Sequence, residues 1–375
     1  MNSRPHNLKS EQLENHLLRE ILPQYRPGER IPSEVEMARQ LGTSRTTMHK
    51  VYFNLISRGL LYRQSGIGTF RADRAEEPAL RMITAVMPSL HLLNASQTPN
   101  WFNHQYTLEH FADAAREDHF MLNVSFFDHD RYSVDEAERL LNRGDVPAFL
   151  FPALVPELEP LIKRLRAAGK VCVGRYFKPA GFCDSAWFDI ENAMEQAVAH
   201  LANSGRRRIA LLDEWRPELP EIPHYGYPVD RYHAFRRALE KAELPFVSEL
   251  YRFCLGSGAD GEWAVRRMLE EKQNFDAVFC GTDRRAFGAI AALRKAGLRV
   301  PEDVAVVGVN NESGSVGCDP PLATIDCPFD RLARMLYELM RDRLNAPERS
   351  GTESRACTVS FLWRESAGGA PPAIV

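Results

Sequence analysis

The chain has 375 residues, of which 44% are hydrophobic and 26% charged, and its formal net charge is −3. It contains no run of about 18 apolar residues and its first residues lack the apolar centre of a signal peptide, so neither a membrane span nor secretion is indicated and we expect a cytoplasmic protein. The seven cysteines form no C-x-x-C pair, and no His cluster accompanies them, so no metal site is predicted. This length suits a small domain joined to a larger one.

Charge is distributed unevenly along the chain. Residues 1–74 hold 12 Lys and Arg against 7 Asp and Glu, whereas the remainder holds 35 against 43. A basic segment on an acidic body suits nucleic-acid binding, because phosphate neutralisation requires cations while the acidic body limits non-specific adhesion.

Three short helices are predicted in the first 60 residues. Apolar residues recur at helical spacing over 13–22, where prolines end the segment. Ser33 and Glu36 form a capping-box pattern that opens a second helix over 33–40. A third helix opens at Thr43-Ser44, and the three helices share one small apolar core.

The start of the third helix carries groups that suit DNA. It reads Ser44-Arg45-Thr46-Thr47, followed by His49 and Lys50. Hydroxyls and free N–H groups at a helix N-terminus bind phosphate oxygens, and the Arg45 guanidinium matches guanine O6 and N7 in the major groove. A hairpin containing Gly66 follows, which suits a wing that presses backbone against the DNA.

The stretch GERIPSEVEMARQLGTSRTTMHKVYFNLISRGLLYRQSGIGTF resembles the DNA-binding domain of the GntR family of bacterial regulators, and the resemblance spans residues 8–72. It implies a small α+β winged helix-turn-helix domain, residues 1–72, that binds double-stranded operator DNA. Many relatives have Arg at the positions of Val35 and His49, so the preferred operator is expected to differ. A winged helix used only for protein contacts is the alternative. The predicted DNA contacts are Ser33, Ser44, Arg45, Thr46, Thr47, His49, Lys50 and Gly66.

A polar, proline-bearing linker, 73–80, precedes a second domain, 81–375. There, apolar strand-length runs alternate with amphipathic helical stretches, which predicts parallel sheets covered on both faces. Nearly 300 residues of this pattern suggest two sheets, with a ligand site beyond the carboxyl ends of the strands. The clearest predicted strands are 82–87, 122–127, 148–151, 171–173, 209–212, 277–280 and 304–309, and the helices are 108–117, 157–168, 192–203, 230–242, 262–271 and 284–296.

The stretch FDAVFCGTDRRAFGAIAALRKAGLRVPEDVAVVGVNNES, with PPLATIDCPFDRLARMLYELM after it, resembles the effector-binding domain of the LacI/GalR family. The match covers about residues 81–366 and is clearest in the second half. A GntR-type head on this body resembles the arabinose-responsive repressor subgroup more than LacI itself. The resemblance implies an α/β fold with a two-lobed, periplasmic-binding-protein-like effector domain that holds a small molecule between its lobes.

Six residues fall at positions that suit a ligand site in this family. A guanidinium at Arg231 can hold two neighbouring sugar hydroxyls, and aromatic rings can cover the apolar face of a pyranose. Asn310 stands where much of the family has Asp, which suggests a ligand other than the usual hexoses. Arg231 also suits an interlobe salt bridge, the aromatic residues also suit a core, and Asp283 suits a helix cap. The predicted ligand contacts are Arg231, Asn310, Thr282, Trp263, Phe329 and Asn192.

No catalytic motif is recognisable. Residues 256–261 fit G-x-G-x-x-G but lie deep in the domain without a suitably spaced acidic residue, so a glycine-rich loop near the ligand site is favoured over a nucleotide site. Phosphate-binding loops, serine elbows and H-E-x-x-H pairs are absent from the sequence. We therefore expect no enzyme activity and no cofactor, with an enzyme that carries an accessory winged helix as the alternative.

These patterns predict a homodimeric transcription regulator, most simply a repressor, that binds a roughly palindromic operator. Its expected effector is a sugar, and a nucleobase or another non-sugar compound is the alternative.

Overall fold

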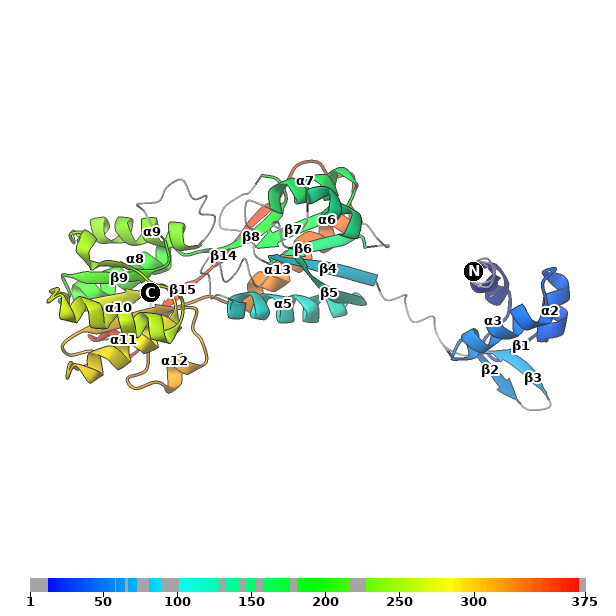
Figure 1. Ribbon diagram of the computed structural model, residues 1–375, viewed down its shortest axis with the longest axis horizontal. Coiled ribbons are helices and arrows are strands. Elements are labelled where there is room, and N and C mark those ends of the chain that lie inside the picture. The colour runs from blue at the N-terminus through cyan, green and yellow to red at the C-terminus, as the bar shows by residue number, and fades with distance from the viewer. Residues whose placement is uncertain are drawn as a thin grey trace. The chain divides into compact units, whose positions relative to one another are not determined.

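The computed structural model describes residues 13–57, 59–64, 67–72, 81–88, 101–127, 133–141, 146–152, 158–175, 181–215 and 227–370. The chain divides into two compact units, Met1–Leu80 and Arg81–Val375, which we call the head and the body (Figure 1). In these described segments, no helix has both the length and the apolar character needed to cross a bilayer.

The head packs short helices on a small antiparallel sheet. Ser33 Oγ accepts the Glu36 N–H at 3.3 Å and Glu36 Oε2 accepts the Ser33 N–H at 2.8 Å, so the predicted capping box is confirmed. The buried core includes Leu17, Met37 and Met48. The elements are a π-helical turn (Leu17–Ile21), a 3-10 turn (Leu22–Gln24), β1 (Arg30–Ile31), α2 (Glu34–Gln40), α3 (Arg45–Ser57), β2 (Leu61–Gln64) and β3 (Gly68–Arg71), with strand order β1-β3-β2.

The body contains two six-stranded sheets, as predicted. The first lobe has strand order β14-β8-β7-β6-β4-β5 and the second lobe β10-β9-β11-β12-β13-β15. All strand pairs are parallel except β13 with β15, which is antiparallel and departs from the all-parallel prediction. The bounds are β4 (Arg81–Pro88), β5 (Phe120–Phe127), β6 (Ala148–Phe151), β7 (Val171–Arg175), β8 (Asp184–Asp189), β9 (Ile209–Asp213), β10 (Tyr251–Phe253), β11 (Ala277–Cys280), β12 (Ala305–Val309), β13 (Ala323–Asp326), β14 (Ser354–Thr358) and β15 (Ser360–Leu362).

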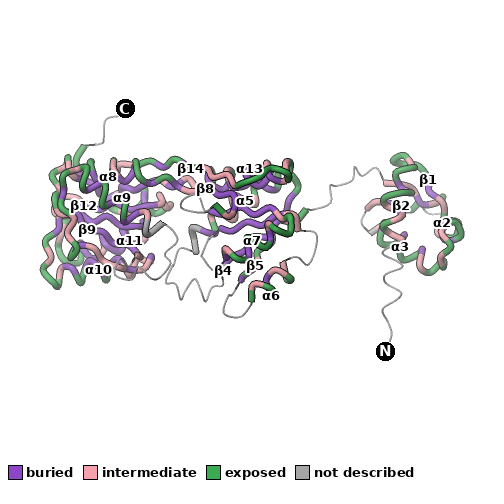
Figure 2. Tube along the Cα trace, turned by 90° about the horizontal axis from the view of Figure 1, so that it is seen from above, coloured by how far each residue is buried: buried purple, intermediate pink, exposed green. Residues whose placement is uncertain are grey.

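Helices cover both faces of each sheet, because successive side chains of a buried strand point to opposite faces. In β9, Ile209 and Leu211 join one apolar cluster and Ala210 and Leu212 another, and this strand is buried along its whole length (Figure 2). In the first lobe, α5 (Trp101–Arg116) and α13 (Phe329–Asn345) lie opposite α6 (Val134–Leu141) and α7 (Glu159–Ala167). In the second, α8 (Glu191–Asn203) and α9 (Tyr227–Lys241) lie opposite α10 (Gly258–Glu270) and α11 (Asp283–Lys295), with the short α12 (Gly314–Gly317) nearby (Figure 1).

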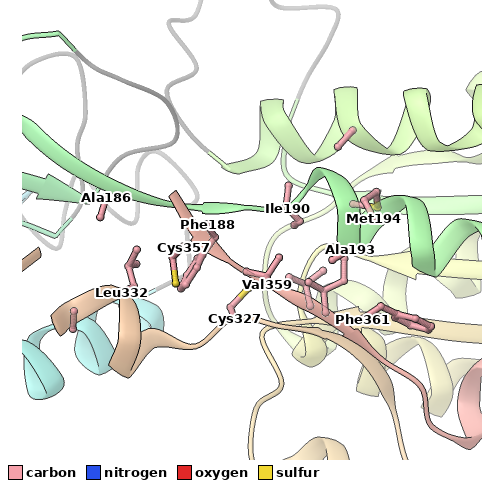
Figure 3. Packing of buried hydrophobic residues seen from close by; sticks show 14 of the residues in the cluster. Ala186, Phe188, Ile190, Ala193, Met194, Cys327, Leu332, Cys357, Val359 and Phe361 are labelled. Carbon is pink, nitrogen blue, oxygen red and sulfur yellow. The ribbon is translucent and has the colours of Figure 1, made fainter. Parts of the chain in front are cut away.

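The chain passes between the lobes at three places. These are the connections from β8 to α8, from β13 to α13, and from β14 to β15. Phe188, Ile190, Cys327, Cys357 and Val359 pack together there in one apolar cluster (Figure 3). One continuous core therefore joins the two lobes.

Candidate DNA-contacting face and effector site

The exposed start of α3 has the polar surface predicted from the sequence. Ser44 caps the helix: its Oγ accepts the Thr47 N–H at 3.1 Å and lies 2.8 Å from Thr47 Oγ1. Arg45, Thr46 and Lys50 are exposed, and among the described residues no ion pair or hydrogen bond engages Arg45 or Lys50. Two hydroxyls are thus held by the helix start while the cations remain available to a polyanion.

A partly buried carboxylate links this helix to the rest of the head. Glu34, in the first turn of α2, lies 3.0 Å from His49 Nδ1 and also accepts a hydrogen bond from Arg63 of β2. The link fixes one side of the His49 imidazole. Sequence reasoning missed both partners, because Glu34 and Arg63 lie 29 positions apart and share no local pattern.

The remaining two predicted DNA-contacting residues of the head are Ser33 and Gly66. Ser33 is exposed but its hydroxyl serves the cap of α2. Gly66 lies outside the described residues. Beside it, Gly68 has φ +148°, and a Cβ there would lie 2.6 Å from Arg30 Nε, so the hairpin requires glycine at that position.

Phe53 is a head residue that sequence reasoning did not single out. Its side chain is 65% exposed on α3. It follows Lys50 by three positions and His49 by four, so it shares their helix face, away from Met48 and the core. The apolar ring suits contact with thymine methyl groups, while the neighbouring cations and hydroxyls suit contact with phosphates.

In the second lobe, the carboxyl ends of the strands carry a buried charge cluster. Arg231 of α9 donates from Nε and Nη2 to Asp213 at 2.8 and 2.6 Å, where β9 ends. Arg285 of α11 donates to Glu214 at 2.9 Å and to Asp213 at 3.4 Å. Burial alone would lower the pKa of Arg231, but Asp213 and Glu214 hold it above its usual range. The four charges balance one another.

Gly281 leaves the room that this cluster needs. A Cβ on Gly281 would lie 2.7 Å from Arg285 Nη1 and 2.8 Å from Asp213 Oδ1. Sequence reasoning found Arg231 but missed Asp213, Glu214 and Arg285. The signal available was only that an acidic pair directly follows an apolar strand.

Thr282 and Asp283 begin α11 in different roles. Thr282 is buried and caps the helix, its Oγ1 accepting the Arg285 N–H at 3.3 Å. Asp283, expected as the cap, instead accepts from Ser315 Oγ, Thr324 Oγ1 and the Glu312 N–H, each at 2.6 Å. Burial raises the pKa of Asp283 to about 6 although these three donors oppose the shift.

Asn310 directly follows β12 in a rare backbone conformation, with φ +109°. Its own N–H donates to Ile325 O at 2.8 Å, which holds the residue beside the end of β13. Its side-chain Nδ2 is buried and has no acceptor among the described residues. An unsatisfied buried donor costs about 1–3 kcal/mol, so this amide is suited to an acceptor supplied by a ligand.

Phe329 lies where the first lobe meets the end of β13. Its ring packs edge-on against Phe188 at 5.1 Å between centroids, and the Arg175 guanidinium carbon lies 5.9 Å from its centroid. Arg175 ends β7, and its Nη2 lies 2.9 Å from His104 Nδ1. Burial, together with the charge of Arg175, holds the pKa of His104 well below its usual range, so the imidazole is neutral. Arg175 and His104 were missed by sequence reasoning.

The remaining two predicted ligand residues lie on helix surfaces. Trp263 is 49% exposed on α10, on the side opposite the buried Gly261, Ala264 and Val265. Asn192 lines a shallow groove of about 330 Å³ between α8 and α9. The structure therefore groups Arg231, Thr282 and Asn310 at the carboxyl ends of second-lobe strands, with Phe329 after β13, and places neither Trp263 nor Asn192 among them.

Residues 256–261, the G-x-G-x-x-G pattern, serve helix packing. Ser257 caps α10, and its Oγ accepts the Asp260 N–H at 3.2 Å. A Cβ on Gly261 would lie 2.2 Å from the Arg285 carbonyl oxygen, so glycine allows α10 to approach α11 closely. The loop is thus a cap and a helix contact, and it also lies beside the predicted ligand residue Thr282, whose Oγ1 donates to Gly256 O at 3.5 Å.

Comparison with known proteins agrees with both units. Residues 9–70 match the family model of bacterial regulatory proteins of the gntR family, and residues 198–367 match that of the periplasmic binding protein-like domain. The HTH-type transcriptional repressor PurR of Pectobacterium carotovorum is 31% identical over 194 residues, 51% of this chain and 54% of that protein. The HTH-type transcriptional regulator CelR of Thermobifida fusca is 31% identical over 161 residues, 42% of this chain and 45% of that protein. The chain spans about half the length of these curated relatives.

Solved structures share the fold. A complex of the transcriptional regulator CelR with cellobiose has a TM-score of 0.63 at 22% identity and covers 90% of this chain and 100% of its own. A LacI family regulator from Enterococcus faecium with bound ribose has a TM-score of 0.60 at 22% identity and covers 76% and 98%. The chain therefore joins a segment that matches the gntR family of bacterial regulatory proteins to a body that matches the periplasmic binding protein-like domain, and solved LacI family regulators share its fold.

Proposed function

We propose that the chain is a sequence-specific DNA-binding transcription regulator, a homodimeric repressor that acts in the cytoplasm and responds to a small molecule held by the body. The observation that carries the proposal is the exposed face of α3, where Arg45, Thr46 and Lys50 project from a capped helix start. A short helix reads only a few base pairs, so two heads on a two-fold symmetric operator supply the specificity.

The head is tested with Arg45→Ala. We expect the variant to lose about 1–3 kcal/mol of operator affinity, because a bidentate contact to guanine is worth about that much. The operator is first selected by sequencing genomic fragments that the purified protein retains, and affinity is then measured by fluorescence anisotropy at fixed salt. Arg19→Ala is the matched control, since Arg19 is also exposed but lies outside α3 and the hairpin. Equal affinities for the wild type and Arg45→Ala would contradict the assignment.

For the effector we propose a sugar. At the strand ends the Asn310 amide is the donor that suits a hydroxyl oxygen, and Arg231 can add at most its Nη1 group because its Nε and Nη2 donate to Asp213. The solved neighbours with cellobiose and ribose are similar folds that hold carbohydrates. A ligand switches the regulator only by the difference between its affinities for the DNA-competent and incompetent states.

The effector proposal is tested by thermal-shift screening of sugars and of purines with the full chain. For the compound that binds, we expect Asn310→Asp to weaken affinity at least tenfold, because it removes the amide donor and adds a charge while retaining a residue type that tolerates positive φ. Asn192→Asp is the matched comparison, and there we expect a much smaller effect because Asn192 lines the outward groove. Binding of a purine and of no sugar would contradict the proposal of a sugar effector. Turnover of the bound compound would favour an enzyme over a regulator.

A further inference from the structure

Asp283, the first residue of α11, is a carboxylate with no cationic partner. Its side chain is fully buried, and none of the described Lys, Arg and His residues forms an ion pair with it. Burial raises the pKa of Asp283 to about 6, so the carboxylate is largely ionised at pH 7.5. A buried charge without a counter-ion is costly, and a neutral side chain would avoid that cost. The charge therefore indicates a role beyond packing.

Three donors surround this carboxylate. Oδ2 accepts the Glu312 N–H and the Ser315 hydroxyl, and Oδ1 accepts the Thr324 hydroxyl, each at 2.6 Å. Gly308 of β12 leaves the space, because a Cβ there would lie 2.2 Å from Asp283 Oδ1. The donors come from the loop after β12, from α12 and from β13. One carboxylate thus ties three segments to the start of α11.

The loop tied in this way contains the turn that carries Asn310. Asn310 and Asn311 have φ +109° and +54°, backbone conformations that residues other than glycine adopt only at a cost in free energy. Each backbone N–H of the turn has an acceptor: Ile325 O at 2.8 Å for Asn310, Thr324 Oγ1 at 3.4 Å for Asn311, and Asp283 Oδ2 at 2.6 Å for Glu312. Two of these three bonds depend on Asp283, one directly and one through the Thr324 hydroxyl.

The two asparagines differ in what holds their side chains. Asn311 Nδ2 donates to Asp326 Oδ1 at 3.0 Å, and Asn311 Oδ1 accepts from Arg364 Nη2 at 2.7 Å. By contrast, the buried Nδ2 of Asn310 has no acceptor among the described residues. The backbone of the turn is therefore what orients this donor.

We propose that Asp283 is a positioning residue of the effector site: its carboxylate holds residues 310–312 in their positive-φ turn and so directs the Asn310 amide towards the effector. Hydrogen bonds to a charged acceptor are about twice as strong as neutral ones, so a carboxylate suits this place better than an amide. The inference rests on the proposed function for the effector, whereas the hold on the turn is a property of the body alone.

The first measurement is hydrogen exchange in full-length variants at pH 7.5, without effector or DNA, in peptides that contain residues 310–312. Asp283→Asn is expected to speed exchange there about tenfold, because a neutral amide replaces the charged acceptor. Thr324→Val removes the hydroxyl between Asp283 and Asn311 and is expected to speed it about fivefold. Thr324→Ser retains the hydroxyl and should stay within about twofold of the wild type.

Ser315→Ala is the matched control. It removes a hydrogen bond of the same 2.6 Å length from the same carboxylate, yet the Ser315 hydroxyl binds no N–H of residues 310–312 in the described structure. Exchange in the turn should therefore change less than about twofold. Peptides from β11 report the stability of the whole lobe in each variant, so a local effect on the turn is separated from general destabilisation. Circular dichroism checks that each variant is folded.

The second measurement is the dissociation constant of the sugar that gives the largest shift in the thermal-shift panel, by titration calorimetry. We expect Asp283→Asn to raise it about fivefold and Ser315→Ala to leave it within about twofold. Unchanged exchange at 310–312 in Asp283→Asn would overturn the proposal, as would equal acceleration by Thr324→Val and Ser315→Ala or an unchanged dissociation constant. If exchange responds as expected but no compound binds, the hold on the turn is supported and the effector part of the proposed function is contradicted.

Discussion

At the scale of single residues, Arg231 contributes to stability through its buried ion pair with Asp213. Removing Arg231 leaves Asp213 and Glu214 with only Arg285 to balance them, in a site where Arg231 and Asp213 are at most 4% exposed. Breaking a buried pair in this way typically costs about 3–5 kcal/mol. We therefore expect Arg231→Ala to lower the free energy of unfolding by about that amount in urea titrations.

The matched control is Arg237→Ala on the same helix, whose ion pair with Glu191 is half exposed on both sides. That pair should contribute less than about 1 kcal/mol. Equal losses for the two variants would show that the cluster around Asp213 is not the stabilising unit described here. Because Arg231→Ala also destabilises the fold, any effect of this variant on effector binding has to be interpreted together with its free energy of unfolding.

Sequence reasoning could find these residues but not their partners. Arg231, Thr282 and Asn310 were predicted because each follows a strand or lies at a recognisable family position. Asp213 lies 18 positions from Arg231 and 72 from Arg285, and no periodicity connects residues so far apart. For the same reason the sequence could not show that Trp263 points away from the core of the second lobe.

At the scale of elements, close packing of α10 on α11 depends on glycines. A Cβ on Gly288 would lie 1.8 Å from the Gly258 carbonyl oxygen, a distance that only separation of the helices relieves. Overpacking of this kind typically costs about 1–3 kcal/mol and occasionally more. We expect Gly288→Ala to lower the melting temperature and the free energy of unfolding accordingly.

Gly317→Ala is the control for this prediction, because a Cβ there meets nothing within 4 Å. It should shift the free energy of unfolding by no more than about 0.5 kcal/mol. If Gly288→Ala proved as mild, the two helices would be free to move apart and the G-x-G-x-x-G pattern would need another explanation.

The elements themselves were largely predictable. The predicted strands 122–127 and 277–280 correspond to β5 and β11, and each predicted helix overlaps an observed one. The spacing of apolar residues and the length of an apolar run are local properties of the sequence, so an element can be predicted from them without knowledge of its tertiary contacts. The three crossings between lobes were not predictable, since a strand's pattern says that it is buried but not in which sheet.

At the scale of the whole molecule, the two lobes should respond oppositely to acid. In the first lobe His104 is neutral, with a pKa held well below 6.5 by burial and by Arg175. Its contribution to stability is complete above pH 6.5 and is lost as pH falls, because the unfolded chain takes up the proton first. Between pH 7.5 and 5.5 the first lobe should lose roughly 1 kcal/mol through this group.

In the second lobe Asp283 has its pKa raised to about 6 by burial, from an ordinary 3.8. The folded state therefore binds the proton first, so this group stabilises the second lobe as pH falls from 7.5 to 5.5, by about 1 kcal/mol. Hydrogen exchange corrected for intrinsic rates, followed in peptides from β6 and β11, measures the two slopes separately. His104→Gln should remove the first slope and Asp283→Asn the second. Slopes that His104→Gln and Asp283→Asn leave unchanged would contradict the assignment of the pH dependence to these two groups.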